Sequence, residues 1–185
     1  MKIALYFGSF NPIHIGHVAL AEYVKAHAGV DAVWLVVSPQ NPLKQKGDLW
    51  DDKYRLELAQ LACADCEGIE VSNIEFDLPQ PNYTANTLRQ FSLRYPEHTF
   101  QLMIGADNCE IFDKWREYDF ILSHYTVLVY PREGYNSTKL MSGMKVIDAP
   151  LYPYSSTQVR QALEDGQSIE DLVPQKVYQR ILEKN

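Results

Sequence analysis

The stretch of sequence that says most about the fold is KIALYFGSFNPIHIGH, which occupies residues 2–17. Its first part, 2–7, is β-rich and predicts a short strand. Apolar residues then recur at helical spacing over 17–27, which predicts a helix packed on one face. Between them, Gly8 and Gly16 allow a ligand or another backbone to come close. A strand that leads through such a loop into a helix start is a typical phosphate site, with free backbone N–H groups and the positive end of the helix dipole.

The rest of the chain continues to alternate between strands and helices. Apolar or β-rich runs predict five further strands, at 32–38, 69–74, 99–104, 125–130 and 145–148. Helical spacing predicts further helices at 53–64, 85–95, 157–164 and 174–183, with one or two short helices within 107–122. This alternation predicts parallel βαβ units with right-handed crossovers, and therefore an α/β fold with a parallel sheet flanked by helices. We find no internal repeat or linker-like stretch, and we expect a single domain over 1–185.

Composition places the chain among ordinary globular proteins. Of its 185 residues, 46% are hydrophobic and 22% are charged, which is far from the disordered class. The net charge of -7 argues against a protein that coats nucleic acid, because such proteins normally present a basic face. The longest apolar run, 32–37, is too short for a membrane span of about 20 residues, and the first residues lack the features of a signal peptide. We therefore expect a soluble cytoplasmic protein with no nucleic-acid or membrane partner.

The three cysteines agree with a reducing compartment, because an odd number excludes a complete disulfide framework. Cys63 and Cys66 have the spacing of a redox pair or of half a zinc site. No second Cys-x-x-Cys and no neighbouring histidine accompanies them in the sequence. We interpret them as two ordinary thiols at a helix end.

Two short segments contain residue types that bind polyphosphate. His14 and His17 stand three residues apart, and their imidazoles can donate hydrogen bonds to neighbouring oxygens of one polyphosphate. There are two alternative interpretations of this pair. The histidines are two metal ligands, although no third ligand stands nearby in sequence, or they are two incidental histidines of a loop. Near the other end of the chain, Ser156 or Thr157 is expected to cap a helix. This second segment fits a plain helix start and an anion site containing Arg160 equally well.

Together the two segments resemble the nucleotidyltransferases with a His-x-Gly-His motif. In that superfamily the C-terminal motif is Ser-Ser-Thr-x-Ile/Val-Arg, which stands here at 155–160. The finer resemblance is to the bacterial nicotinate-nucleotide adenylyltransferase family, and it extends over most of the chain. It includes a proline-rich loop ending in lysine at 39–44, a Tyr-Thr-x-x-Thr-Leu segment at 83–88, a Gly-Ala-Asp segment at 105–107 with a downstream Trp115, an Arg-x-Gly turn at 132–134 and a closing helix after 172.

The chain departs from that family's usual pattern at three positions. Ser9 stands where a second glycine is usual, Asn11 where an aspartate is usual, and Leu43 where a histidine usually precedes the lysine. Asn11 also occurs in related enzymes that adenylate the nicotinamide form. These departures bear on substrate preference and leave the reaction class unchanged.

The resemblance implies a Rossmann-like nucleotidyltransferase that performs a step of NAD biosynthesis. ATP and nicotinate mononucleotide would give nicotinate adenine dinucleotide and pyrophosphate. Mg2+ would arrive bound to ATP, with no metal ligands from the protein. A homo-oligomer is possible. The implied catalytic residues are His14, His17, Lys44 and Arg160. The implied ATP site contains His14, His17 and Arg160 with Gly8, Ser9, Phe10, Gly105, Asp107, Ser155, Ser156 and Thr157. The implied nicotinate mononucleotide site contains Asn41, Lys44, Tyr83, Thr84 and Trp115.

These residue types suit that chemistry on physical grounds. The nucleophile is a phosphate, which is already an anion at pH 7 and needs no general base. The protein must align two anions and stabilise charge on the α-phosphoryl group and the departing pyrophosphate. Thr84 is expected to cap a helix that starts near 85, and the N–H groups of that helix start would favour the carboxylate of nicotinate over the amide of nicotinamide.

Several alternatives stay open at this point. Asp107 fits a ribose contact or a helix N-cap, Trp115 fits a pyridine platform or the core, and Arg132 fits a phosphate contact or a turn. A nucleotide sensor without turnover and an RNA-binding role are alternatives from other classes. Pantetheine-phosphate adenylyltransferases and cytidylyltransferases are the rivals within the enzyme class, and the 83–84 segment with Trp115 favours the pyridine nucleotide.

Overall fold

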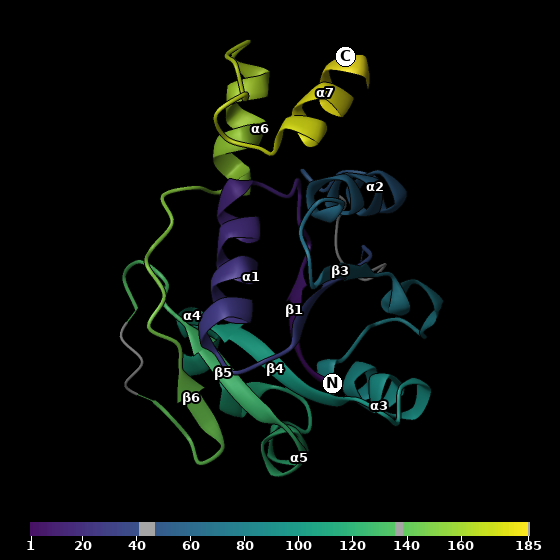
Figure 1. Cartoon of the computed structure of the whole chain (residues 1–185), viewed down its shortest axis with the longest axis vertical. Helices are drawn as coiled ribbons and strands as arrows, with labels where there is room; N and C mark the ends of the chain where they lie inside the picture. The colour runs from purple at the N-terminus through teal and green to yellow at the C-terminus, as the bar shows by residue number, and fades with distance from the viewer. Residues whose placement is uncertain (41–46, 136–138, 185) are drawn as a thin grey trace.

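A six-stranded sheet forms the centre of the computed structural model, which describes residues 1–40, 47–135 and 139–184. The strand order is β3-β2-β1-β4-β5-β6, and every neighbouring pair is parallel (Figure 1). The strands are β1 (Lys2–Gly8), β2 (Ala32–Val37), β3 (Ile69–Ser72), β4 (Thr99–Gly105), β5 (Thr126–Tyr130) and β6 (Met144–Val146). All six predicted strands are present, and the predicted parallel α/β sheet is confirmed.

Helices connect and follow these strands. Those in the described ranges are α1 (Ile15–His27), α2 (Asp52–Cys63), α3 (Thr84–Arg94), α4 (Ala106–Glu110), α5 (Tyr118–His124), α6 (Ser156–Glu164) and α7 (Gln175–Lys184), with 3₁₀ helices η1 (Ile74–Asp77) and η2 (Phe112–Lys114). The predicted third strand is too long by two residues. The Ser72 hydroxyl accepts the N–H of Ile74 at 3.3 Å, which turns the chain out of the sheet and into η1.

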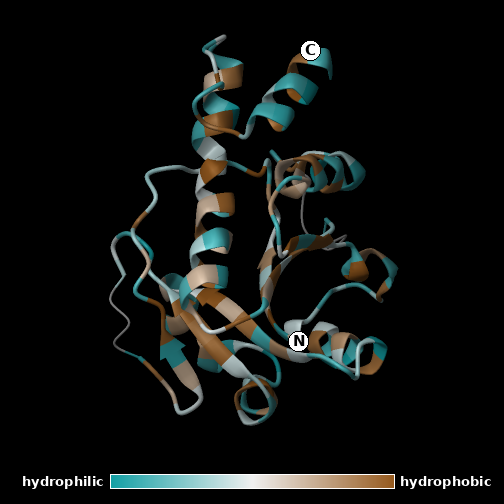
Figure 2. Cartoon of the chain, in the orientation of Figure 1, coloured by the Kyte–Doolittle hydropathy of each residue, from teal (hydrophilic) through white to brown (hydrophobic). Residues whose placement is uncertain are grey.

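The alternation of side chains along the strands divides the core into two clusters. Along β1, Ala4 and Tyr6 belong to a cluster with α1, α2, α6 and α7, whereas Ile3 and Leu5 belong to one with α3, α4 and α5. Both faces of the sheet are covered, which explains why its central strands are apolar along almost their whole length. In Figure 2 the helices show both brown and teal, as expected when one face packs and the other meets solvent. None of the helices in the described ranges is long and apolar enough to span a membrane.

The strand order indicates where a ligand should bind. The chain adds β2 and then β3 outward from one side of β1, and afterwards returns to place β4 on the other side of β1. Open α/β sheets bind ligands at such a switch point, outside the carboxyl ends of the strands. Here those ends are Gly8 of β1 and Gly105 of β4, each the last residue of its strand.

Candidate active site

The start of α1 is capped by two histidines instead of the usual hydroxyl and carboxyl side chains. His14 is the N-cap residue, and its Nδ1 accepts the backbone N–H of His17 at 3.3 Å. In return, Nδ1 of His17 accepts the backbone N–H of His14 at 3.0 Å, and the two rings stack with their centroids 3.6 Å apart. A ring nitrogen that accepts a hydrogen bond carries no proton, so the proton of each neutral ring lies on Nε2. Both rings can therefore donate from Nε2 to a ligand.

Both histidines are held in the neutral form. Burial and, as a smaller cause, the charge of Arg132 together lower the pKa of His14 to about 4. Burial also lowers the pKa of His17 well below its ordinary value, with smaller effects from His14 and Arg132. At neutral pH the pair supplies two N–H donors without two buried positive charges. Such a pair suits hydrogen bonding to an anion better than proton transfer from an imidazolium.

We expect the free energy of unfolding to decrease as the pH falls from 6.5 towards 4. His14 has an ordinary pKa of 6.5, and a pKa of about 4 in the folded protein. Over this window the unfolded chain binds a proton that the folded chain does not, which favours unfolding, whereas above 6.5 both states are neutral. The measurement is urea unfolding between pH 4 and 8 in wild type and His14→Gln. In His14→Gln the free energy of unfolding should decrease less between pH 6.5 and 4 than in wild type. An equal decrease in both proteins would contradict the lowered pKa of His14.

The start of α6 is capped by Ser155, whose hydroxyl accepts the N–H of Gln158 at 3.0 Å. The expectation that Ser156 or Thr157 caps this helix is therefore wrong. Ser155 has the extended backbone of an N-cap residue (φ -144°, ψ 153°), and the helix already begins at Ser156. The hydroxyl of Ser156 is consequently free for a contact outside its own helix.

The start of α6 docks on the loop that leads into α1. Ser156 Oγ donates to the carbonyl of Pro12 at 2.8 Å, and Arg160 Nη1 donates to the carbonyl of Asn11 at 2.6 Å. Arg160 Nη2 also donates to Thr157 Oγ1 at 3.2 Å. The structure thus brings the two segments together across almost the whole length of the chain, and the N-terminal ends of two helices meet at one place.

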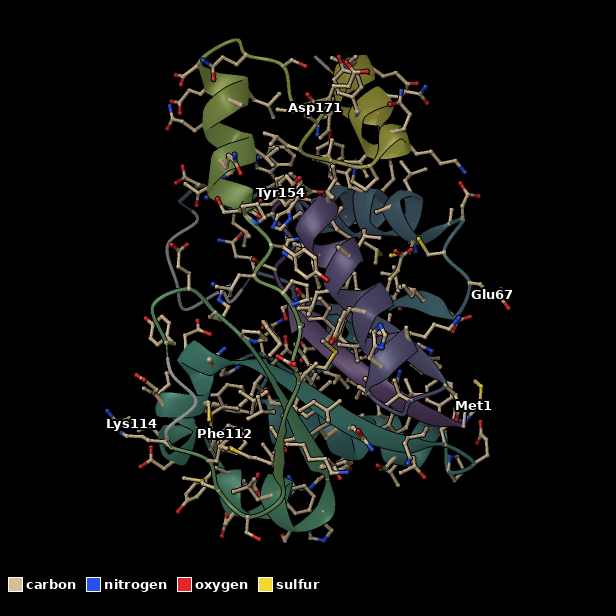
Figure 3. The ribbon with its side chains drawn as sticks, turned by 60° about the vertical axis from the view of Figure 1, so that its left-hand side comes forward. Met1, Glu67, Phe112, Lys114, Tyr154 and Asp171 are labelled. Atoms are coloured by element: carbon tan, nitrogen blue, oxygen red, sulfur yellow. The ribbon has the colours of Figure 1, made fainter. Side chains whose placement is uncertain are left out.

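Close packing holds the histidine pair. A Cβ on Gly16 would lie 2.9 Å from Cε1 of His14 and 3.3 Å from Cβ of Tyr154. Tyr154, labelled in Figure 3, lies between the start of α6 and the N-terminal end of α1, with its ring centroid 6.5 Å from that of His14. On the other side, the buried ring of Phe10 meets the ring of His17 edge-on at 4.9 Å.

The end of β4 contributes a second polar group. Gly105 is the N-cap residue of α4, and a Cβ on it would lie 2.5 Å from Oδ1 of Asp107. Asp107 lies inside α4, so the alternative that it is the N-cap is wrong. Arg132, just after β5, places its Nε 3.7 Å from Asp107 Oδ1. The structure therefore places Arg132 beside Asp107, and the carbonyl of Arg132 also accepts the N–H of Tyr135 at 3.1 Å in the predicted Arg-x-Gly turn.

The start of α3 is not capped by Thr84, so that prediction is wrong. Tyr83 has the extended N-cap backbone (φ -93°, ψ 135°), Thr84 is the first helical residue, and no described side chain caps this helix. The guanidinium of Arg116 lies 4.5 Å from the ring centroid of Tyr83, which places the 115–116 segment beside the helix start. Trp115 is half-buried, and its ring packs against Phe112 with the centroids 4.9 Å apart.

A cavity of about 240 Å³ lies beside the same helix start. It is lined by residues between 78 and 90, including Asn82, Tyr83, Asn86 and Arg89. The histidine pair does not line this cavity, whereas Tyr83, one of the residues predicted for the nicotinate mononucleotide site, does. The predicted residues Asn41 and Lys44 lie outside the described residues.

Asn11 has a role that its sequence position did not reveal. Its buried side chain donates from Nδ2 to the carbonyl of Asp48 at 2.9 Å and accepts the N–H of Trp50 on Oδ1 at 2.9 Å. An aspartate could not donate to that carbonyl. The Asn11 side chain thus holds the loop before α1 against the backbone of Asp48 and Trp50.

Cys63 and Cys66 are both free, as are all the cysteines in the described ranges. Burial raises the pKa of Cys63 to about 12, and burial also raises the pKa of Cys66. Neither thiol is a reactive thiolate at neutral pH. In the described part of the chain, no three side chains of the metal-binding types gather around a common point.

This geometry belongs to a recognised class. A family model for cytidylyltransferase-like proteins matches residues 5–162, which include both histidines and Arg160, and the chain belongs to that family.

Close relatives narrow the class. A protein of Bacteroides fragilis named "Probable nicotinate-nucleotide adenylyltransferase" is 45% identical over 99% of this chain and 92% of its own length. A protein of the same name from Flavobacterium johnsoniae is 44% identical over 100% of this chain and 98% of its own length. Within its class, the chain is therefore a member of the nicotinate-nucleotide adenylyltransferases, and the resemblance noted in the sequence is confirmed.

Solved structures share the fold. A nicotinic acid mononucleotide adenylyltransferase of Plasmodium falciparum, solved as a complex with NaAD, superposes with a TM-score of 0.80 at 17% identity. The match covers 100% of this chain and 96% of that one. The Rossmann-like nucleotidyltransferase arrangement predicted for the sheet is therefore confirmed.

Proposed function

We propose that this protein transfers the adenylyl group of ATP to nicotinate mononucleotide, giving nicotinate adenine dinucleotide and pyrophosphate in NAD biosynthesis. The observation that carries the proposal is the neutral His14–His17 pair, whose Nδ1 atoms are occupied and whose Nε2–H groups can donate, at a helix start beside a second helix start. The names of the bacterial relatives and the NaAD complex of the Plasmodium enzyme support the choice of substrates.

The proposed reaction is a direct in-line displacement without a covalent enzyme intermediate. The phosphate of nicotinate mononucleotide attacks the α-phosphorus of ATP, a new P–O bond forms, and the bond to the pyrophosphate oxygen breaks. The phosphate is already ionised at neutral pH, so the neutral histidines need not remove a proton from it. Their Nε2–H groups and the guanidinium of Arg160 stabilise the charge that develops on the phosphoryl oxygens. Lys44 is a further donor in this proposal.

Arg160 is partly engaged in the ligand-free protein. Its Nη1 and Nη2 donate to Asn11 and Thr157, which hold the guanidinium beside the loop before α1. A guanidinium has five N–H donors, so the donors that these two bonds leave unused can bind phosphate oxygens. The hydroxyls of Ser155 and Thr157 and the backbone of residues 8–10 complete the proposed ATP site.

We propose that Mg2+ arrives bound to ATP. The crevice offers mainly nitrogen donors from histidine and arginine, whereas Mg2+ prefers oxygen. The phosphates and water would supply its ligands, because the Asp107 carboxylate at this strand end is paired with Arg132. When bound, the cation would neutralise part of the polyphosphate charge. The donor chemistry of the described residues fits a metal that comes with the substrate.

The substrate proposal is tested by pyrophosphate release. Purified protein with Mg2+-ATP is given nicotinate mononucleotide, nicotinamide mononucleotide or phosphopantetheine in parallel, and CTP replaces ATP in a fourth reaction. We expect the highest kcat/KM with ATP and nicotinate mononucleotide. Faster release with phosphopantetheine or with CTP would favour a rival nucleotidyltransferase, and no release with any pair would favour a binding protein without turnover.

We expect wild type to prefer the nicotinate form by at least about tenfold, which takes about 1.4 kcal/mol of differential binding. The N–H groups of Thr84 and Ala85, in the first turn of α3, have no backbone acceptor among the described residues and face negative charge favourably. Because Thr84 is the first helical residue, proline at this position removes one N–H while the helix can still form. The extended backbone of Tyr83 is also compatible with a following proline. Thr84→Pro should therefore reduce the preference.

Thr84→Ala is the matched control, because it removes only a side chain that does not cap the helix. It should keep the preference, whereas Trp115→Ala should weaken both nucleotides alike. The measurement is the ratio of kcat/KM values for the two nucleotides. Equal ratios in Thr84→Pro and Thr84→Ala would show that this N–H does not read the pyridine substituent.

We propose that residues 1–185 act as one functional domain, because the histidine pair and Arg160 come from opposite ends of the chain and meet at one place. The cytoplasmic location, the lack of a nucleic-acid partner and the assembly state remain predictions. The net charge of -7 continues to disfavour nucleic acid.

A further inference from the structure

One arginine in the described chain has no solvent exposure at all. Arg55 lies on α2, is 0% exposed, and has the largest fully buried side chain. A charged side chain is almost never fully buried unless it is completely paired. Arg55 does not belong to the sequence motifs considered above, and the proposed reaction does not use it.

Its partners lie at the edge of the sheet where the substrates are proposed to bind. Arg55 Nη1 donates to the carbonyl of Ser9 at 2.6 Å and to that of Ser38 at 2.8 Å, directly after β1 and β2. Its Nε donates to the carbonyl of Trp50 at 2.9 Å, and its Nη2 pairs with Asp52 Oδ1 at 2.5 Å. The guanidinium therefore makes four hydrogen bonds within the protein. Arg55 is not placed to bind a phosphate itself. It connects three chain segments, namely the ends of β1 and β2 and the segment 50–52.

The bond to Ser9 determines how the next peptide group points. In a trans peptide the C=O and the following N–H point in opposite directions. With the Ser9 carbonyl turned inward to Arg55, the N–H of Phe10 must turn the other way. No backbone partner for that N–H occurs among the described residues. An unsatisfied N–H beside Gly8 and the histidine loop is a suitable donor for a phosphate oxygen.

Phe10 also has an unfavourable backbone. Its φ of 47° is in the left-handed region, which is uncommon for a residue other than glycine, asparagine or aspartate. Such a conformation persists only where the surroundings enforce it, and it is frequent at functional sites. Two features enforce it here: the ring of Phe10 is buried against Tyr6 and His17, and Arg55 holds the preceding carbonyl.

We propose that Arg55 is a positioning residue for ATP: it holds the Ser9–Phe10 peptide in its strained orientation, so that the Phe10 N–H faces the polyphosphate. This inference rests on the proposed function, because it needs ATP at the loop before α1. It assigns Arg55 an indirect role, in which the guanidinium binds carbonyl groups and the backbone N–H binds the substrate.

The first test is the affinity of Arg55→Lys for a non-hydrolysable ATP analogue, measured by calorimetry with Mg2+. Lysine keeps the charge but cannot reach several carbonyls with a planar fork. We expect the affinity to fall at least about tenfold, and the KM of nicotinate mononucleotide to change less than about twofold. Arg180→Lys is the matched control. Arg180 lies on α7, is partly exposed, and pairs with Glu57, which lies on α2 as Arg55 does. The control should bind the analogue like wild type.

A structural role alone would give a different result. If Arg55→Lys loses thermal stability but binds the analogue as wild type does, or weakens both substrates equally, the proposal is overturned. If wild type does not bind the analogue, the proposed function fails together with this inference. If wild type binds it and Arg55→Lys is unaffected, only this inference fails.

A second measurement needs no Arg55 variant, which matters because a buried substitution can prevent folding. The chain has seven phenylalanines, so selective ¹⁵N labelling gives a small set of amide signals. The signal of Phe10, identified by its loss in Phe10→Leu, should shift strongly when the analogue is added to wild type. A Phe10 amide that does not respond while the analogue binds would overturn the proposal.

Discussion

Replacing His17 by alanine is expected to lower kcat by about 10²–10³, while the affinity for ATP changes much less. The reason is that the Nε2–H of His17 is a preorganised donor: the tautomer of His17 is set by the bond from the His14 N–H, and its ring orientation by stacking on His14 and by edge-on contact with Phe10. Removing one such donor to a developing oxyanion typically has an effect of this size. The measurements are steady-state pyrophosphate release and calorimetric binding of an ATP analogue.

His27→Ala is the matched control for this experiment. His27 lies at the other end of α1, where its ring packs against Tyr23 with the centroids 4.4 Å apart. The control should keep wild-type turnover, since it removes a histidine from the same helix but from outside the site. A His17→Ala protein with near wild-type kcat would show that the histidine pair is a structural cap only.

Replacing Gly16 by alanine is expected to lower kcat by about 10² and also to lower the melting temperature, because it displaces the His14 ring that caps α1. The new Cβ would lie 2.9 Å from Cε1 and 3.0 Å from Nδ1 of the His14 ring, so the ring must move away. A displacement of about 1 Å at a reacting centre can lower the rate about 10²-fold. Gly16 is the second residue of α1, so the helix propensity that favours alanine in a helix interior does not offset the disturbed cap. Both kcat and the melting temperature should therefore fall.

The reverse substitution on the same helix, Ala19→Gly, separates these two effects. It should reduce the melting temperature and leave kcat near the wild-type value, because Ala19 lies outside the histidine pair. Thermal unfolding and pyrophosphate release, measured on both variants, provide the comparison. A Gly16→Ala enzyme with unchanged kcat would mean that the position of the His14 ring does not affect the rate.

Much of the fold was already determined by local sequence pattern. The period of the apolar residues distinguishes strand from helix, and an apolar run such as 32–37 predicts a strand buried on both faces. The His14–His17 pair is local as well, because a spacing of three residues is the spacing of an N-cap and its N3 partner. For these features, neighbours in sequence are also neighbours in space.

The helix caps were predictable only to within one residue. Ser155 caps α6 where Ser156 or Thr157 was expected, and Tyr83 precedes α3 where Thr84 was expected. Several adjacent residues can satisfy the same side-chain preference, and the backbone dihedral angles in the folded protein decide among them. The consequence is functional, because it changes the proposed role of Thr84 from its hydroxyl to its backbone N–H.

The contacts that complete the site depend on the tertiary structure. Arg55 and Ser9 are 46 residues apart in sequence, and Arg160 and Asn11 are 149 apart. Their meeting follows from the parallel sheet, which brings the carboxyl ends of all its strands to one edge regardless of their separation along the chain. By itself, the sequence determined the elements, the histidine motif and the family. Only the tertiary structure decided that Arg55 is buried and binds backbone carbonyls, because the burial and the partners of a side chain depend on how the helices pack on the sheet.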